Sequence, residues 1–169
     1  AELNIKGNGV ARTLRSRVIQ SPLAGVSDQV FRKLVRRWAP EALLFTEMVK
    51  ASLLESGKGH YKINELSKEE GPIGVQLFDH CPESMVEAAI RAEACGAFLI
   101  DINMGCPAKR IARKGGGSGL LKEPELAVKI VNKVANAIQI PVTVKTRLNC
   151  EQDGHSDPVN FAQRIQNAG

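Results

Sequence analysis

What this 169-residue sequence lacks excludes several classes of protein. None of its apolar stretches approaches the ~20 residues of a membrane-spanning helix. Residues 1–18 lack the apolar block of a secretory signal, so we expect a cytoplasmic protein with no membrane partner. Aromatic residues make up only 4% of the chain, which argues against an open stacking platform for single-stranded RNA.

Cysteine and histidine are also scarce, with four and three residues respectively. The cysteines are Cys81, Cys95, Cys106 and Cys150, and no two of them form a C-x-x-C pair. These spacings fit neither a zinc knuckle nor a small disulfide scaffold. We therefore expect reduced thiols and no metal site, with a structural role for Cys81, Cys95 and Cys150.

Basic residues exceed acidic ones, which makes the formal net charge +5 and the isoelectric point about 9.2. The bases gather in three clusters, within residues 12–17, 32–37 and 109–114. A basic balance favours a polyanionic partner, and nucleic acid is the commonest. The alternative is that each cluster is a solvated face without a partner.

Short apolar runs alternate with longer amphipathic ones along the chain. The apolar runs predict strands at 16–21, 42–47, 71–77, 97–103 and 140–147. The amphipathic runs predict helices at 28–38, 48–55, 82–95, 123–138 and 157–169. Apolar strands separated by amphipathic helices indicate parallel β/α units with both faces of the sheet covered.

Five β/α units are compatible with two architectures, an open doubly wound sheet and a (β/α)8 barrel that lacks its last three units. The first unit has no G-x-G-x-x-G, which argues against a Rossmann dinucleotide site. In the helix at 28–38 we expect one apolar side and the four bases on the other. The apolar residues are Val30, Phe31, Leu34, Val35 and Trp38.

Every predicted strand ends in polar or special residues, and in parallel α/β folds these ends form the functional face. They are Ser21 and Pro22, Thr46 and Glu47, Gln76, Asn103, and residues 145–147. We therefore expect one shared site. The glycine-rich stretch at 113–121 is either a flexible surface loop or a substrate-contacting lid.

Five stretches of the chain, in order, read SPLAGVSDQVFRKLVRR, TEMV, GVQLF, DINMGCPAKRIARKGGGSGLL and PVTVKTRL. In this order and spacing they resemble the N-terminal barrel of the tRNA-dihydrouridine synthases, flavoenzymes that reduce a uracil base in transfer RNA. The resemblance implies a (β/α)8 TIM barrel of which residues 1–169 form the N-terminal part, about the first five units. The later barrel units and the family's helical tRNA-binding domain would then be absent.

The same resemblance implies flavin mononucleotide (FMN) as cofactor and NADPH, or more broadly NAD(P)H, as reductant. Pro22, Leu23 and Ala24 would run along the flavin ring, and Gln76 would hydrogen-bond its polar edge. Lys145 would sit beside the N1–O2 side, where a cation stabilises the charge of the reduced ring. Asn103 would complete the wall between flavin and substrate.

Cys106 matches the cysteine that the family uses as general acid. Reduction of the uracil C5=C6 bond needs a hydride at C6 and a proton at C5, and a side chain close by must give the proton. The neighbouring bases instead favour a thiolate, so the sequence leaves the protonation state open. The expected contacts to tRNA phosphates are Lys109, Arg110, Arg113 and Arg147.

After VKTR the family usually continues with glycine and tryptophan, whereas residues 148–156 here read LNCEQDGHS. The family's later strands also carry a histidine and the site for the FMN phosphate. We therefore expect the isolated chain to be inactive and its intact parent to be a tRNA-dihydrouridine synthase. The alternatives are a non-catalytic RNA-binding module and a flavin barrel that reduces a free pyrimidine.

Overall fold

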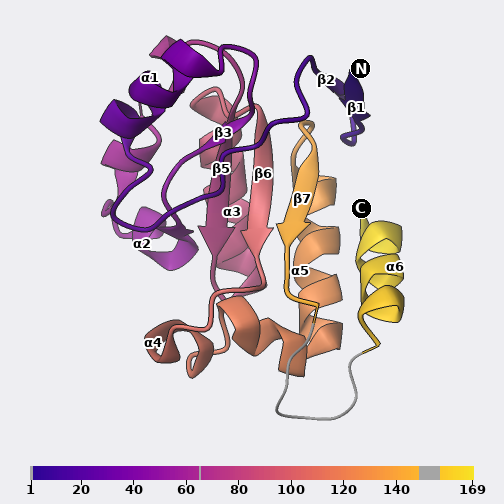
Figure 1. Cartoon of the computed structure of the whole chain (residues 1–169). Helices are drawn as coiled ribbons and strands as arrows, with labels where there is room; N and C mark the ends of the chain where they lie inside the picture. Colours follow the sequence, from indigo (N-terminus) through magenta and orange to yellow (C-terminus); the bar gives the residue numbers. More distant parts are fainter. Residues whose placement is uncertain (1, 65, 149–156) are drawn as a thin grey trace.

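The computed structural model describes residues 2–64, 66–148 and 157–169, which form a parallel sheet with helices packed against it (Figure 1). The sheet contains β3 (Leu44–Phe45), β4 (Val49–Lys50), β5 (Ile73–Phe78), β6 (Leu99–Asn103) and β7 (Val142–Lys145). The α-helices are α1 (Gln29–Trp38), α2 (Ala51–Glu55), α3 (Pro82–Ala94), α4 (Lys109–Ala112), α5 (Pro124–Ala137) and α6 (Pro158–Ala168). Three 3-10 helices are η1 (His60–Lys62), η2 (Leu66–Lys68) and η3 (Gly117–Lys122).

The strands lie side by side in the order in which the chain forms them. β3, β5, β6 and β7 are parallel neighbours. The strand predicted at 16–21 is reduced to one parallel bridge, from Ile19 to Leu43, which places this segment beside β3. A doubly wound sheet reverses this order at a switch point, whereas a barrel strand always pairs with the next one. The fold is therefore that of an incomplete (β/α)8 barrel, as predicted.

The second predicted strand is divided into two short pieces. β3 pairs with the start of β5 through Leu44 and Ile73, and β4 pairs with its end through Val49 and Leu77. Thr46 still donates its N–H to the Gly74 carbonyl at 3.0 Å, and residues 47–48 separate the two pieces beside the middle of β5. The helix that we predicted to begin at Met48 consequently begins at Ala51.

The two faces of the sheet differ because successive side chains of a strand point to opposite sides. Val75, Leu77, Ile100 and Ile102 are buried in the main hydrophobic core with the apolar sides of α3 and α5. The other face is apolar near the amino ends of the strands, where Leu99 lies, and carries the buried polar residues Gln76, Asp101 and Asn103 farther along. One face therefore supplies the core, and the other supplies polar groups that lead to the strand ends.

Helix α3 begins and ends where its sequence indicates. Pro82 occupies the first turn, where its missing N–H needs no partner. Gly96 follows the helix with a φ of +94°, a left-handed conformation that favours glycine. The predicted helix at 82–95 is confirmed, and so are the helices at 123–138 and 157–169.

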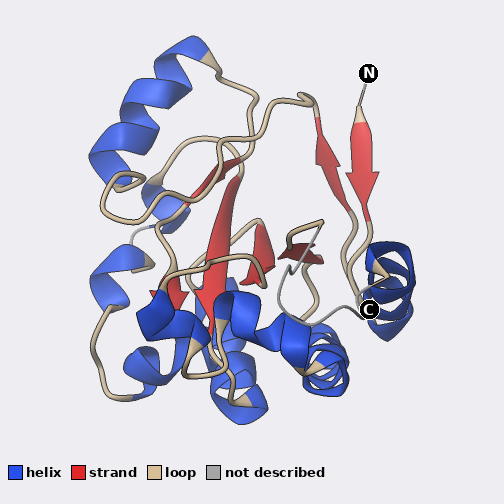
Figure 2. Cartoon of the chain, turned by 60° about the horizontal axis from the view of Figure 1, so that its bottom comes forward, coloured by secondary structure: helices blue, strands red, loops and turns tan. Residues whose placement is uncertain are grey.

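A two-stranded hairpin that we did not predict covers the amino ends of the strands. It consists of β1 (Leu3–Ile5) and β2 (Arg12–Leu14), and Figure 2 shows it apart from the main sheet. Leu14 is buried with Leu43, Phe45 and Leu99 in a second apolar cluster. The hairpin loop donates from the N–H groups of Gly9 and Val10 to the carbonyl of Gln139 at 3.1 and 3.0 Å.

Helix α1 faces the protein differently from our prediction. Its start is as expected, because the Asp28 side chain caps it by accepting from the N–H of Phe31 at 2.8 Å. Phe31 and Val35 are half-buried, but Val30, Leu34 and Trp38 are exposed, at 75%, 54% and 85%, and Arg32 is buried. The expectation that the bases of this helix all face solvent is wrong for Arg32.

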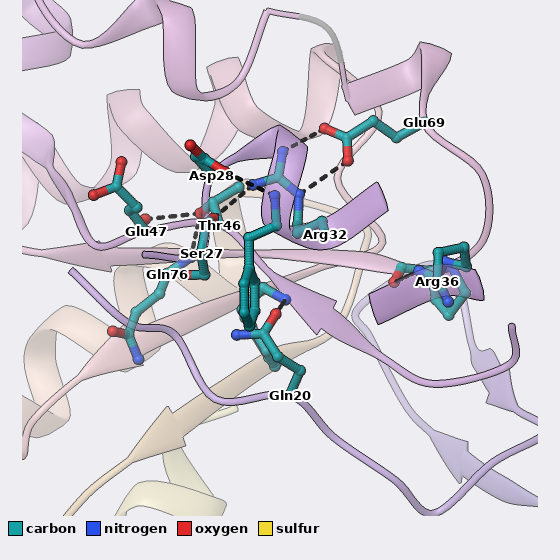
Figure 3. Close-up of polar contacts among 12 residues, drawn as sticks. Gln20, Ser27, Asp28, Arg32, Arg36, Thr46, Glu47, Glu69 and Gln76 are labelled. Carbon is teal, nitrogen blue, oxygen red and sulfur yellow. Dashed lines mark hydrogen bonds and ion pairs between the residues drawn. The ribbon is translucent and has the colours of Figure 1, made fainter. Parts of the chain in front are cut away.

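Arg32 can be buried because all its bonds go to well-placed acceptors (Figure 3). Its Nε donates to Glu69 Oε2 at 2.9 Å, its Nη2 pairs with Glu69 Oε1, and its Nη1 donates to the Ser27 carbonyl at 2.8 Å. Arg36 donates to the carbonyls of Ala42 at 2.6 Å and Pro72 at 3.1 Å, just before β3 and β5. Such pairing is what makes a buried charge tolerable.

Candidate functional site

The residues that we predicted as a site lie along the carboxyl ends of the strands, at the bottom of Figure 1 where α4 is found. Gln76 of β5 pairs in register with Asp101 of β6, and Asn103 pairs with Lys145 at the end of β7. Gln76 and Asn103 are buried, whereas Lys145 is exposed. The structure thus brings these three residues together on one rim.

The loop formed by residues 22–24 follows the Ile19 bridge. Ser27 stabilises it, since its Oγ accepts from the N–H of Leu23 at 2.8 Å and donates to the Leu23 carbonyl at 3.0 Å. Glu47, which follows β3, accepts from the N–H of Gly25. Leu23 and Ala24 remain exposed and Pro22 is half-buried. The loop is therefore accessible on one side and fixed by Ser27 and Glu47 on the other.

A chain of hydrogen bonds links the inner faces of three strands. Asp101 accepts from Gln76 Nε2 at 2.6 Å through one carboxylate oxygen and from Thr143 Oγ1 at 2.8 Å through the other. Gln76 Oε1 accepts in turn from Asn103 Nδ2 at 2.9 Å. The polar groups of this face therefore form one network.

Asn103 connects that network to Cys106. Its Oδ1 accepts from the backbone N–H groups of Gly105 at 3.1 Å and Cys106 at 2.9 Å, and its Nδ2 also approaches Met48 Sδ at 3.1 Å. Both N–H bonds and both lone pairs of the amide are engaged within the chain. Asn103 thus holds the loop that follows β6 and leaves Cys106 half-buried at the rim.

Burial raises the pKa of Asp101 from its ordinary value of 3.8 to about 6, against the opposing effects of Gln76, Thr143 and Lys145. The sequence analysis did not single out Asp101 or Thr143. A signal for Asp101 was present, because it is the one charged residue in the apolar run AFLIDIN. A carboxylate inside a buried strand is rare unless it is bonded there.

The glycine-rich stretch is packed under Cys106, so the interpretation as a flexible surface loop is wrong. Gly116, Gly117 and Gly119 are buried, and Ser118 donates from its N–H to the Cys106 carbonyl at 3.0 Å. Gly117 has a φ of +57°, and a Cβ there would lie 2.8 Å from the Cys106 carbonyl oxygen. Close approach of this backbone to Cys106 requires glycine.

The four basic residues predicted to contact tRNA are all exposed on this side of the molecule. Lys109 and Arg110 belong to α4 and Arg113 follows it. Arg147 lies close to the Cys106 loop, because a Cβ on Gly105 would be 3.5 Å from Arg147 Cγ. The basic residues therefore surround the loop that carries Cys106.

Arg110 also lines a cavity of about 270 Å³ that the sequence analysis did not find. Its other basic groups are Lys50, Lys114 and His80, from three different segments. Asp79 lies among them and accepts from the N–H groups of Ser52 at 3.0 Å and His80 at 2.8 Å. Only the fold brings these bases together, so no local sequence signal could have shown the cavity.

The other cysteines have structural surroundings. Cys81 precedes α3, and Cys95 packs against the main core; Cys150 and the departure at 149–156 lie outside the described residues. Within the described ranges, no cluster of three or more His, Cys, Asp or Glu side chains is arranged to hold a metal ion. Across those same ranges, no helix has the length and apolar character needed to cross a membrane.

The chain matches known proteins over most of its length. Residues 19–169 match the family model described as dihydrouridine synthase (Dus). The chain is 54% identical over 157 residues to "Probable tRNA-dihydrouridine synthase 1" of Synechocystis sp., covering 93% of this chain and 44% of that protein. It is 38% identical over 159 residues to "tRNA-dihydrouridine synthase B" of Pseudomonas aeruginosa, covering 93% and 47%. The chain spans about half the length of the curated relatives it matches.

Proposed function

The chain belongs to the dihydrouridine synthase family, and from that membership we propose that it serves the FMN-dependent reduction of uridine in tRNA. NAD(P)H is the proposed reductant, and the cytoplasm is the proposed compartment. The observation that carries the proposal is the position of Cys106. It lies half-buried at the carboxyl end of β6, held by Asn103 and surrounded by exposed bases.

The polar groups on this rim fit the ring of FMN. Gln76 retains one N–H and one Oε1 lone pair after its bonds to Asp101 and Asn103, which suits the polar edge of a flavin. Lys145 is an exposed cation beside Asn103 in the strand register, which suits the electron-rich N1–O2 side. The loop at residues 22–24, in which Leu23 and Ala24 are exposed, is the proposed support for the ring.

When bound at this rim, FMN would supply the hydride needed at C6 of the uracil. Cys106 donates the proton of its thiol to C5, so that the C5=C6 double bond is replaced by two C–H bonds. The resulting thiolate takes up a proton from solvent before the next turnover. Asn103 keeps Cys106 at the rim, and Lys109, Arg110, Arg113 and Arg147 bind the tRNA backbone.

The test is to replace Cys106 in the full-length parent protein and to measure dihydrouridine in tRNA. Cys106→Ala lowers the rate of dihydrouridine formation by about 10²–10⁴-fold, the usual contribution of a general acid, while flavin absorbance of the purified protein is retained. Cys81→Ala is the matched control and leaves the rate unchanged. Unchanged dihydrouridine in Cys106→Ala overturns the role of Cys106.

A second measurement separates this proposal from a non-catalytic RNA-binding module. Arg110→Ala weakens tRNA binding and reduces by about one the slope of log affinity against log salt. Lys145→Met weakens FMN binding and leaves tRNA binding unchanged. Tight, salt-sensitive tRNA binding by a protein that takes up no FMN would contradict the enzymatic proposal.

A further inference from the structure

We infer that Asp101 is a positioning residue for the loop that carries Cys106, and that it acts through the side chains of Gln76 and Asn103. The inference rests on the proposed function for the meaning of Cys106 as proton donor. The hydrogen bonds on which it depends lie within the chain and require neither flavin nor tRNA.

The first step is the polarity of the two amides. The two ends of a glutamine or asparagine amide have nearly the same shape but opposite hydrogen-bonding character. Gln76 turns its Nε2 to Asp101 and therefore its Oε1 to Asn103. Asn103 then turns its Nδ2 to Gln76 and its Oδ1 to the loop. Reversing one amide forces the other to reverse.

The second step is that an ionised carboxylate can only accept hydrogen bonds. Asp101 therefore selects one orientation of Gln76, and Gln76 selects one orientation of Asn103. In the reverse orientation, Asn103 would present its own N–H groups to the backbone N–H groups of Gly105 and Cys106. The two bonds that hold the loop would then be lost.

The third step is burial. Asp101, Gln76 and Asn103 are 4%, 1% and 6% exposed, so water has little access to replace a missing partner. Around Asp101, β5 contributes the neutral Gln76, and β7 contributes the neutral Thr143 and the cationic Lys145. The orientation of Gln76 consequently depends on the charge state of Asp101 itself.

The experiment measures hydrogen exchange of the backbone amides of Gly105 and Cys106 by NMR. Asp101→Asn keeps the shape of the side chain but can present either an acceptor or a donor to Gln76. We expect the protection of Gly105 and Cys106 to fall by about fivefold or more, the effect of losing one net hydrogen bond. The amides of β6 and α3 keep their protection or gain some, because a buried charge has been removed.

If Asp101 only stabilised the fold, Asp101→Asn would change the hydrogen-exchange protection of the loop and of the sheet by the same factor. Unchanged protection of Gly105 and Cys106 in Asp101→Asn, or a fall shared equally with β6, overturns the inference. Thr143→Val is the matched control, because it removes the other bond to Asp101 and keeps the bond to Gln76. We expect Thr143→Val to lower the hydrogen-exchange protection of Gly105 and Cys106 no more than the protection of the β6 amides. A larger loss at Gly105 and Cys106 would contradict the inference.

The pH dependence gives an independent readout in the unmodified protein. Asp101 becomes protonated below pH about 6, and a protonated carboxyl can donate as well as accept. We expect the loop protection, corrected for intrinsic exchange, to fall through this pH range in the unmodified protein and not in Asp101→Asn. Absence of the step overturns the requirement for an ionised Asp101. Failure to form dihydrouridine would count against the proposed function alone.

Discussion

Helices α1 and α5 are both amphipathic, yet the side chains that they bury completely are charged in α1 and apolar in α5. α5 packs against the sheet through Ala127, Ile130, Val131 and Val134, all at most 1% exposed. α1 buries Arg32 and leaves Val30, Leu34 and Trp38 in solvent. The same periodicity in the sequence therefore produces two different relations to the sheet.

The two helices support the site in different ways. The hydrophobic effect that holds α5 against the sheet is not directional. Helix α5 therefore stabilises the sheet as a whole and positions no single loop. The bonds of Arg32 are directional, and one of them ends on the carbonyl of Ser27, whose side chain holds Leu23. Helix α1 thus acts on the loop at residues 22–24 through specific hydrogen bonds.

Breaking the buried ion pair should give the largest effect. Arg32→Ala leaves Glu69 as a buried charge without its partner, and we expect a loss of about 3–5 kcal/mol in the free energy of unfolding, measured in urea. Lys33→Ala, at an exposed position of the same helix, should change it by less than about 0.5 kcal/mol. Similar losses in the two variants would remove the contrast between α1 and α5.

Asp101 is a buried charge of a different kind from Arg32. Its hydrogen bonds come from neutral groups, whereas Arg32 faces an opposite charge. A pKa raised from 3.8 to about 6 means that the folded state binds the proton more tightly than the unfolded state. Stability therefore decreases as pH rises through this range and stays lower above it. At pH 8 we expect Asp101→Asn to be more stable by about 3 kcal/mol.

The free energies of unfolding of the parent and of Asp101→Asn should become equal at low pH. Urea unfolding at several pH values should show the advantage of Asp101→Asn shrinking below pH about 6 and vanishing near the ordinary pKa of aspartate, 3.8. An Asp101→Asn protein that is less stable than the parent at pH 8 would contradict the sign of this prediction.

The smallest effect is expected on the exposed side of α1. Leu34→Ala should change the free energy of unfolding by less than about 0.5 kcal/mol, whereas Ile130→Ala on α5 should lower it by about 2–5 kcal/mol. Leu34 is 54% exposed and Ile130 is fully buried. A loss at Leu34 as large as that at Ile130 would show that another surface covers α1 in solution.

Much of the fold could be predicted because its signals are local. Pro82 and Gly96 delimit α3, and the alternation of strands and helices indicated parallel units. The orientation of α1 could not be predicted in this way. Periodicity defines the apolar side of a helix, but the acceptors that bury Arg32 come from Glu69 and Ser27 in other segments.

The site was predicted less completely than the fold. The strand ends and the family resemblance selected Gln76, Asn103, Cys106 and Lys145, and the structure places them on one rim. Asp101 was missed because it lies in the middle of β6, whereas the predicted site residues were taken from the strand ends. The hairpin of β1 and β2 was missed although Gly7, Asn8 and Gly9 form a turn signal between its strands.

The contact of Gly9 and Val10 with Gln139 also has a consequence for synthesis on the ribosome. The hairpin is translated before this acceptor, which emerges roughly 130 residues later, on the order of ten seconds at ordinary elongation rates. Leu14 meets its apolar neighbours earlier, because Leu43, Phe45 and Leu99 all precede Gln139 in the chain. The contact between the hairpin loop and Gln139 therefore forms late, and the hairpin stays accessible to chaperones until Gln139 has emerged.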